Sequence, residues 1–331
     1  MTKKNIAIVY GGYSSEIIIS EKSMKGIQSF IDKNRYNAYP LLIKNNNWKV
    51  VTNGHSYSVD KNDLSFELDG EKITFDCAYI TIHGTPGENG VLQGYLEMLN
   101  IPHTTCDVLP SALTFNKFTC NTYLKGFGVA VADSVLIRKG NKYDTAAIVE
   151  KLGLPCFVKP NAGGSSFGIS KVKKAEDVAP AIEKAFEESD EVIIEELLEG
   201  RELTCGLYKT SKGENIFPVT EVISKNDFFD FEAKYNAEKA DEITPAPIPN
   251  IIRDRIQKIS SMIYDILGCK GIIRIDYIFS NDKIYMLEVN TTPGMTPTSF
   301  IPQQIKADNR NITDVFTDII EDAIAKNKIR I

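Results

Sequence analysis

Four polar side chains gather on one face of a predicted hairpin in the last quarter of the sequence. Residues 271–279 and 283–290 alternate apolar and polar positions around a short polar segment, which is typical of two antiparallel strands. Successive side chains of a strand point to opposite faces, so the apolar positions predict one buried face. That face comprises Ile273, Ile275, Tyr277 and Phe279 with Tyr285, Leu287 and Val289. The opposite face then carries Arg274, Asp276, Glu288 and Asn290.

The predicted polar face combines three oxygen donors with one guanidinium group. A three-residue turn at 280–282 would pair odd-numbered with odd-numbered residues and place Arg274 roughly opposite Glu288. Carboxylate and amide oxygens suit a hard cation such as Mg²⁺, which is often shared with phosphate groups. A solvated strand face with a surface ion pair would give the same pattern. The hairpin alone therefore leaves both interpretations open.

A lysine at the end of an apolar strand marks a second candidate site. Lys159 closes the strand 156–159, and the loop 161–168 that follows is rich in glycine and serine. Glycine lets backbone N–H groups approach an anion, serine adds donors, and lysine supplies a positive charge. This arrangement suits a phosphate group, but a plain surface loop can have the same composition, so the loop alone does not decide between the two.

The common nucleotide-binding fingerprints do not occur in this sequence. It contains neither Gly-x-x-x-x-Gly-Lys-[Ser/Thr] nor Gly-x-Gly-x-x-Gly, and it lacks the catalytic-loop motif of protein kinases. A nucleotide site would therefore need another architecture.

Length and composition place the chain among ordinary globular proteins. Its 331 residues suggest two or three domains, and 43% hydrophobic with 25% charged residues argues against disorder. The net charge of -6 argues against a nucleic-acid partner. The six cysteines show no disulfide or zinc spacing, and no apolar stretch is long enough for a signal peptide or membrane span. We therefore expect a cytoplasmic protein without a membrane partner.

Alternating strand and helix signals position these residues. We expect strands at 5–10, 77–82, 156–159 and 191–195 in addition to the hairpin. We expect helices at 15–31, 92–99, 110–125, 250–267 and 313–326. The pattern changes near Pro102, which indicates a domain boundary around residue 103. Strand ends followed by glycine loops, such as 83–90, are where open α/β sheets bind ligands.

Taken together, these segments resemble the D-alanine–D-alanine ligase family of ATP-grasp enzymes, in order across nearly the whole chain. The resemblance rests on residues 11–16, 83–84, 87–90, 93–94, 158–160, 164–168, 232–235, 274–276 and 288–296. It implies an α/β protein, α+β in its ATP-grasp part, with three domains. These are an N-terminal Rossmann-like substrate domain (1–103), a central ATP-grasp subdomain (104–198) and a C-terminal ATP-grasp domain with metal and lid elements (199–331).

The resemblance also implies an activity. ATP would phosphorylate the carboxylate of one D-alanine, and the amine of a second D-alanine would attack the acylphosphate. The products would be ADP, phosphate and D-alanyl-D-alanine, a precursor of peptidoglycan. Two Mg²⁺ ions, for which Mn²⁺ can substitute, and a homodimer are further implications of the family.

The family's functional residues match positions along the whole chain. The implied catalytic groups are Glu16, Ser165, Tyr235, Arg274 and Gly294. The implied amino-acid contacts are His83 and Ser299. The implied ATP contacts are Lys117, Lys159, Ser166, Glu195, Glu196, Leu197, Leu198, Glu202 and Lys234. The implied metal ligands are Asp276, Glu288 and Asn290.

Some positions depart from the family pattern. Asn116 stands where an aspartate commonly precedes the lysine, and Gln303 and Gln304 replace residues near a usual lysine. These changes lie around the binding groups and leave a D-serine or D-lactate acceptor as an alternative. A catalytically silent nucleotide-binding module is a further alternative, although such a module would not need the metal ligands and Arg274 together.

Overall fold

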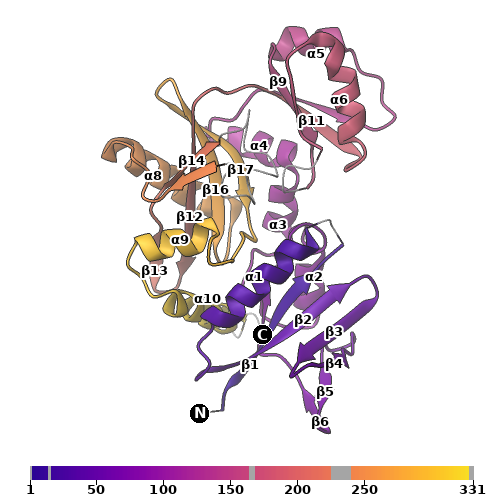
Figure 1. Cartoon of the computed structure of the whole chain (residues 1–331), viewed down its shortest axis with the longest axis vertical. Helices are drawn as coiled ribbons and strands as arrows, with labels where there is room; N and C mark the ends of the chain where they lie inside the picture. Colours follow the sequence, from indigo (N-terminus) through magenta and orange to yellow (C-terminus); the bar gives the residue numbers. More distant parts are fainter. Residues whose placement is uncertain (1, 14–15, 164–167, 225–239, 328–331) are drawn as a thin grey trace.

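The computed structural model describes residues 2–13, 16–163, 168–224 and 240–327. Three larger sheets follow one another along the chain (Figure 1). The first part contains β1 (Lys4–Gly11), α1 (Ile17–Phe30), β2 (Tyr36–Lys44), β3 (Asn47–Thr52), β4 (His55–Ser58), β5 (Phe66–Leu68), β6 (Glu71–Ile73), β7 (Cys77–Ile80) and α2 (Val91–Met98). Its main sheet has the order β4-β3-β2-β1-β7, with β1 parallel to β2 and β7, and β5 and β6 form a separate two-stranded sheet. The central strand β1 is buried from Ile6 to Gly11, as its continuous apolar run predicts.

The middle part is a small antiparallel sheet covered by helices. It follows α3 (Val108–Phe115) and α4 (Lys117–Lys125) and contains β8 (Ser134–Arg138), α5 (Thr145–Leu152), β9 (Cys156–Pro160), β10 (Ser170–Val172), the 3₁₀-helix Ala175–Asp177, α6 (Val178–Ala185) and β11 (Glu191–Glu196). The strand order is β10-β9-β11-β8. Helices α5 and α6 lie together on this sheet (Figure 1), and their apolar sides form a separate core with it.

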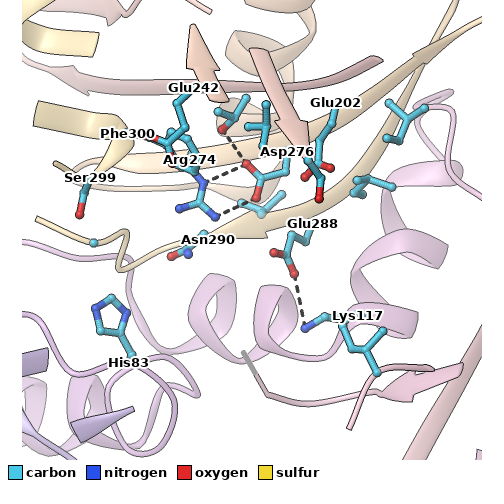
Figure 2. Close-up of a pocket in the computed structure, with 18 of the residues that line it drawn as sticks. His83, Lys117, Glu202, Glu242, Arg274, Asp276, Glu288, Asn290, Ser299 and Phe300 are labelled. Atoms are coloured by element: carbon cyan, nitrogen blue, oxygen red, sulfur yellow. Dashed lines mark hydrogen bonds and ion pairs between the residues drawn. The ribbon is translucent and has the colours of Figure 1, made fainter. Parts of the chain in front are cut away.

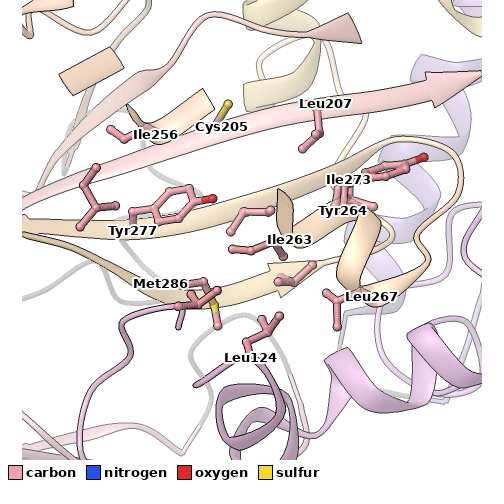
Figure 3. Close-up of a cluster of buried hydrophobic side chains, with 14 of the residues drawn as sticks. Leu124, Cys205, Leu207, Ile256, Ile263, Tyr264, Leu267, Ile273, Tyr277 and Met286 are labelled. Atoms are coloured by element: carbon pink, nitrogen blue, oxygen red, sulfur yellow. The ribbon is translucent and has the colours of Figure 1, made fainter. Parts of the chain in front are cut away.

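The third part carries the predicted hairpin. Its elements are β12 (Arg201–Thr210), β13 (Gly213–Ile216), β14 (Thr220–Ser224), β15 (Ala240–Ile243), α8 (Asn250–Leu267), β16 (Ile273–Ser280), β17 (Lys283–Asn290), α9 (Phe300–Ala307) and α10 (Ile312–Asn327). The sheet order is β15-β14-β12-β16-β17, with β13 paired to β12. Figure 3 shows its core, in which Tyr277 and Met286 of the hairpin lie near Ile256 and Ile263 of α8.

The C-terminal helix returns to the first sheet. Phe316 of α10 stacks on Tyr79 of β7 with ring centroids 5.3 Å apart, and both rings belong to one core with Ile6 and Ile8 of β1. Helix α10 therefore completes the N-terminal core. The domain limits at 103/104 and 198/199 stay a prediction.

The helix predicted at 110–125 is wrong as a single element. The structure has two helices, α3 and α4, separated at Asn116, whose backbone is extended with φ -91° and ψ 98°. The Asn116 side chain accepts a hydrogen bond from the Thr119 N–H at 2.9 Å and so caps α4. An asparagine at this position begins a new helix because its side chain replaces a missing backbone partner.

The hairpin forms, but its predicted turn and register are wrong. Ser280 pairs with Lys283, so the turn has two residues, Asn281 and Asp282, both with positive φ. This geometry fits a tight hairpin turn that matches the twist of the strands. A β-bulge between Asp276 and Tyr277 then shifts the register.

The shorter turn and the bulge together decide which side chains of β17 are buried. Ile284, Met286 and Val289 are buried, whereas Tyr285 and Leu287, predicted for that face, are only partly buried. Beyond the bulge Asp276 pairs with Glu288, and Arg274 pairs with Asn290 rather than with Glu288. The four polar residues still share a face because the bulge restores the odd-with-odd pairing that the shorter turn had removed.

The cysteines and the helices bear on the expected thiol state and on the expected lack of a membrane span. All six cysteines are free and buried. Among the helices in the described part of the chain, none is both long and apolar enough to cross a bilayer.

Candidate active site

A cleft of about 1720 Å³ brings residues of all three parts of the chain together. Figure 2 shows His83 from the N-terminal part, Lys117 from α4, and Asp276 and Glu288 from the hairpin, directed toward a common space. Ligand sites for one small molecule commonly occupy roughly 300–1,000 Å³. The cleft is therefore large enough for more than one substrate.

The hairpin supplies the carboxylates at the centre of the cleft. Arg274 donates to Asp276 through Nε at 2.9 Å and Nη2 at 2.8 Å, and the Thr204 hydroxyl donates to Oδ1 of Asp276 at 2.6 Å. Glu288 lies 3.6 Å from the Lys117 ammonium. Asn290 accepts from the Thr292 N–H through Oδ1 at 3.1 Å.

This donor set fits a hard divalent cation. Asp276 and Glu288 are register partners beyond the bulge, and Asn290 follows two residues later on the same strand. All three line the cleft and offer only oxygen to a cation. Lys117 and Arg274 offset part of the negative charge of these carboxylates in the structure described here.

Two lysines border the cleft on the side of the middle sheet. Lys117 is the first residue of α4, and its Nζ donates to the Gly163 carbonyl at 2.7 Å. Lys159 on β9 forms an ion pair with Glu195 on β11 at 2.6 Å, and both side chains are largely buried. The cap at Asn116 and the pairing of β9 with β11 thus fix both ammonium groups at the cleft.

The segment between the middle and third sheets lines the cleft through Leu197 and Leu198, as does the start of β12 through Glu202. The Glu196 side chain accepts from the Asp133 N–H at 2.8 Å, and the Glu195 side chain is bound to Lys159. To contact a nucleotide base through its side chain, Glu196 would have to give up the Asp133 N–H, and Glu195 would have to give up Lys159.

The N-terminal part closes the other end of the cleft. Glu16 precedes α1 and is 6% exposed, and His83, on the loop after β7, is equally buried. Burial lowers the pKa of His83, Glu16 opposes this shift, and Arg274 adds to it. His83 is therefore predominantly neutral at neutral pH.

Glu88 is a residue for which the sequence suggested no separate role. Its carboxylate accepts from the Gly84 N–H at 2.6 Å and lines the cleft beside His83. Burial, reinforced by Glu16, raises the pKa of Glu88 to about 7. The position of Glu88 in the glycine loop was a signal in the sequence that could have identified it. Thr204 could not be identified from the sequence, because only the pairing of β12 with β16 places it opposite Asp276.

Ser299 and Gly294 form the remaining wall. The Ser299 hydroxyl accepts a hydrogen bond from the Thr296 N–H at 3.1 Å, and it forms a second hydrogen bond with the Thr296 hydroxyl at 2.8 Å. Both residues lie just before α9. A Cβ on Gly294 would lie 3.0 Å from the Ser299 hydroxyl, so glycine keeps this corner open. Ser165, Ser166, Lys234 and Tyr235 lie outside the described residues, and their predicted roles stay predictions.

The sequence matches two family models that together span most of the chain. Residues 5–106 match the D-ala D-ala ligase N-terminus and residues 123–321 match the D-ala D-ala ligase C-terminus. The chain belongs to the D-alanine–D-alanine ligase family. A D-alanine–D-alanine ligase of Phocaeicola vulgatus is 59% identical over 321 residues, which cover 96% of this chain and 99% of that relative.

Solved structures of ligases share the fold. The VanG D-Ala:D-Ser ligase of Enterococcus faecalis has a TM-score of 0.84 at 30% identity, covering 97% of this chain and 99% of that one. The D-alanine–D-alanine ligase of Bacillus anthracis complexed with ATP has a TM-score of 0.79 at 26% identity, covering 99% of both chains. The predicted fold class, a multidomain α/β ligase of the ATP-grasp type, is confirmed.

Proposed function

We propose that this chain ligates two D-alanines to D-alanyl-D-alanine at the expense of ATP, for the synthesis of peptidoglycan precursors. The observation that carries the proposal is the face of the hairpin, where Arg274, Asp276, Glu288 and Asn290 meet Lys117 within one cleft. A relative that is 59% identical over nearly its whole length bears the name of this activity.

ATP occupies the cleft between the middle and third sheets in this proposal. Lys117 and Lys159 hold its phosphates, Leu197 and Leu198 contact the base, and Glu202 binds the ribose. Asp276, Glu288 and Asn290 hold Mg²⁺, which supplies positive charge against the triphosphate and can be replaced by Mn²⁺. In this proposal Ser166 and Lys234 also contact the phosphates of ATP.

The first D-alanine lies at the N-terminal wall. Glu16 binds its ammonium group, and the neutral His83 lies beside its carboxylate without adding a charge there. One carboxylate oxygen attacks the γ-phosphorus, the bond to the bridging oxygen breaks, and ADP leaves. An acylphosphate remains, and closure of the site must exclude water that would hydrolyse it.

The second D-alanine attacks the acylphosphate. Its neutral amine forms a bond to the carbonyl carbon, and Arg274 with the Gly294 N–H stabilises the oxyanion that develops. Ser299 contacts the acceptor carboxylate, and Ser165, Tyr235 and Glu16 orient the attacking amine. Collapse of the intermediate breaks the bond from carbon to the phosphate oxygen, the attacking nitrogen gives up one proton to the leaving phosphate or to water, and inorganic phosphate and the dipeptide are released.

We also propose a cytoplasmic homodimer as the working form. ATP and reduced cysteines are both typical of the cytoplasm, and all six thiols are free in the structure. The oligomeric state can be measured by light scattering of the purified chain.

The test is a ligation assay with ATP, Mg²⁺ and D-alanine that follows phosphate release and product mass. We expect stoichiometric phosphate and D-alanyl-D-alanine, and a loss of at least about 100-fold in kcat for Asp276→Asn. Asp282→Asn, in the exposed turn of the same hairpin, is the matched control and keeps its activity. ATP binding without any ligation would contradict the proposal and favour a silent nucleotide-binding module.

A further inference from the structure

A second carboxylate, that of Glu242, lies near Arg274 in the same cleft (Figure 2). Glu242 on the edge strand β15 accepts a hydrogen bond from Gln303 Nε2 of α9 at 2.7 Å. The same Gln303 nitrogen donates to the Thr298 carbonyl at 2.6 Å. The two hydrogen bonds fix the glutamine amide, and through it they hold the Glu242 carboxylate at one place on the cleft wall.

The surroundings of Glu242 are those proposed for the acceptor. Figure 2 shows Glu242 close to Arg274 and Phe300, with Ser299 on the same side of the cleft. The Arg274 guanidinium lies 5.3 Å from the centre of the Phe300 ring. A molecule that places its carboxylate near Ser299 therefore has Glu242 within reach of its other polar groups.

The ionised form of Glu242 is disfavoured by its partial burial in the cleft wall. Arg274 directs two of its N–H groups to Asp276. Burial raises the pKa of Glu242, and the hydrogen bond from Gln303 and the charge of Arg274 only partly oppose this shift. A cationic group brought by a substrate would stabilise the ionised carboxylate, whereas a second anion would destabilise it.

We propose that Glu242, oriented by Gln303, is a specificity-determining residue of the acceptor subsite that favours an amino-acid acceptor over a 2-hydroxy acid. An amino acid enters with an ammonium group that this carboxylate attracts. A 2-hydroxy acid carries only its negative carboxylate, so it gains no such attraction and is repelled. This inference rests on the proposed ligase function and adds the residue that sets its acceptor preference.

The test compares two acceptors in one reaction. D-Alanine at a fixed saturating concentration serves as donor and acceptor, D-lactate is added as competitor, and the ratio of depsipeptide to dipeptide is measured by mass spectrometry. In Glu242→Gln the amide oxygen can still accept from Gln303, so the change removes charge with little change of shape. We expect the ratio to rise at least about tenfold, as removal of a nearby charge predicts.

A second variant tests the same charge by another route. Gln303→Lys places an ammonium group against Glu242 and neutralises it, so the product ratio should again rise. Glu67→Gln is the control, since it removes a carboxylate from an exposed position of β5, outside the cleft, and should leave the product ratio unchanged. The KM for the acceptor D-alanine should rise in Glu242→Gln while the KM for ATP stays unchanged.

The outcomes separate this inference from the proposed function. A wild-type chain that forms no dipeptide contradicts the ligase function itself. Normal ligation by the wild type, with a product ratio that Glu242→Gln leaves unchanged, overturns only the role of Glu242. An equal fall in kcat for both acceptors without a change in ratio also overturns it, because a purely structural residue would behave in that way.

Discussion

Asp276 accepts hydrogen bonds from Arg274 and Thr204, so its carboxylate has a fixed orientation before any ligand binds. Such fixing removes part of the entropic cost of assembling a site around ATP. The sequence indicated Arg274 and Asp276 as neighbours on one strand face. It could not indicate Thr204, which lies 72 residues away along the chain and meets Asp276 only through the sheet.

Glu88 offers a residue-scale prediction about pH. The pKa of this carboxyl is raised to about 7 in the folded chain, chiefly by burial, from an ordinary value of 4.5. Its protonated form is therefore favoured in the folded state, and stability is lost as pH rises from the unfolded to the folded pKa. We expect wild type to lose up to about 3 kcal/mol of unfolding free energy relative to Glu88→Gln between pH 4.5 and 7.5.

Urea denaturation of both chains at pH 4.5, 6 and 7.5 measures this difference. Glu67→Gln, at an exposed position of β5, is the control and should show no such trend. A difference between wild type and Glu88→Gln that stays constant across these pH values would contradict the assigned pKa.

At the scale of elements, alternation predicted the hairpin and its polar face but not the details of its geometry. A periodic pattern gives the face of each strand, whereas the turn length depends on whether Asn281 and Asp282 adopt left-handed conformations. The two-residue turn and the bulge beside Asp276 together decided which residues of β17 are buried. The helix break at Asn116 was missed for a similar reason, because a single capping side chain within a helical pattern gives a weak signal.

Asn116 offers a prediction at this scale. Its amide donates to Glu191 at 3.1 Å while its oxygen caps α4. Asn116→Asp keeps the cap but replaces the amide group that donates to Glu191 with a carboxylate oxygen, so that two carboxylates face each other. We expect a loss of about 1–2 kcal/mol in unfolding free energy at pH 7, which diminishes near pH 4 as the carboxylates become protonated.

Thermal and urea denaturation of Asn116→Asp and Asn116→Ser measure the two contributions. Serine keeps a cap without adding a charge but removes the hydrogen bond to Glu191, so its loss at pH 7 should be smaller than that of Asn116→Asp and should also diminish near pH 4. An Asn116→Asp chain as stable as wild type at pH 7 would show that the Glu191 contact does not determine the choice of asparagine.

At the scale of the molecule, the N-terminal part packs directly on the segment that carries Gly294. The Ser23 hydroxyl of α1 accepts from the Met295 N–H at 3.2 Å, and a Cβ on Gly26 would lie 2.2 Å from the Met295 carbonyl oxygen. Sequence periodicity could not predict this contact or the return of α10 to the first sheet, because both depend on how separate units pack.

Gly26→Ala therefore tests the contact between α1 and residues 291–299. Alanine normally stabilises a helix relative to glycine by about 1 kcal/mol, but here the clash should dominate and cost about 1–3 kcal/mol. We also expect a higher KM for D-alanine, because α1 and residues 291–299, which both line the cleft, would move apart. Stability is measured by denaturation and KM by phosphate release.

Gly94→Ala is the matched control in α2. Its Cβ would meet Val108 at an ordinary 3.5 Å, so this change should be neutral or slightly stabilising and should leave KM unchanged. Equal effects of the two substitutions would contradict the proposed role of the contact at Met295.

The most direct test of the central claim follows one oxygen atom. D-Alanine labelled with ¹⁸O in its carboxylate is incubated with ATP, Mg²⁺ and the protein, and the released phosphate and dipeptide are analysed by mass spectrometry. If the carboxylate oxygen attacks the γ-phosphorus in the cleft beside Asp276, each dipeptide formed must be accompanied by one phosphate that contains one ¹⁸O. Phosphate without the label, or labelled phosphate without D-alanyl-D-alanine, would contradict this account.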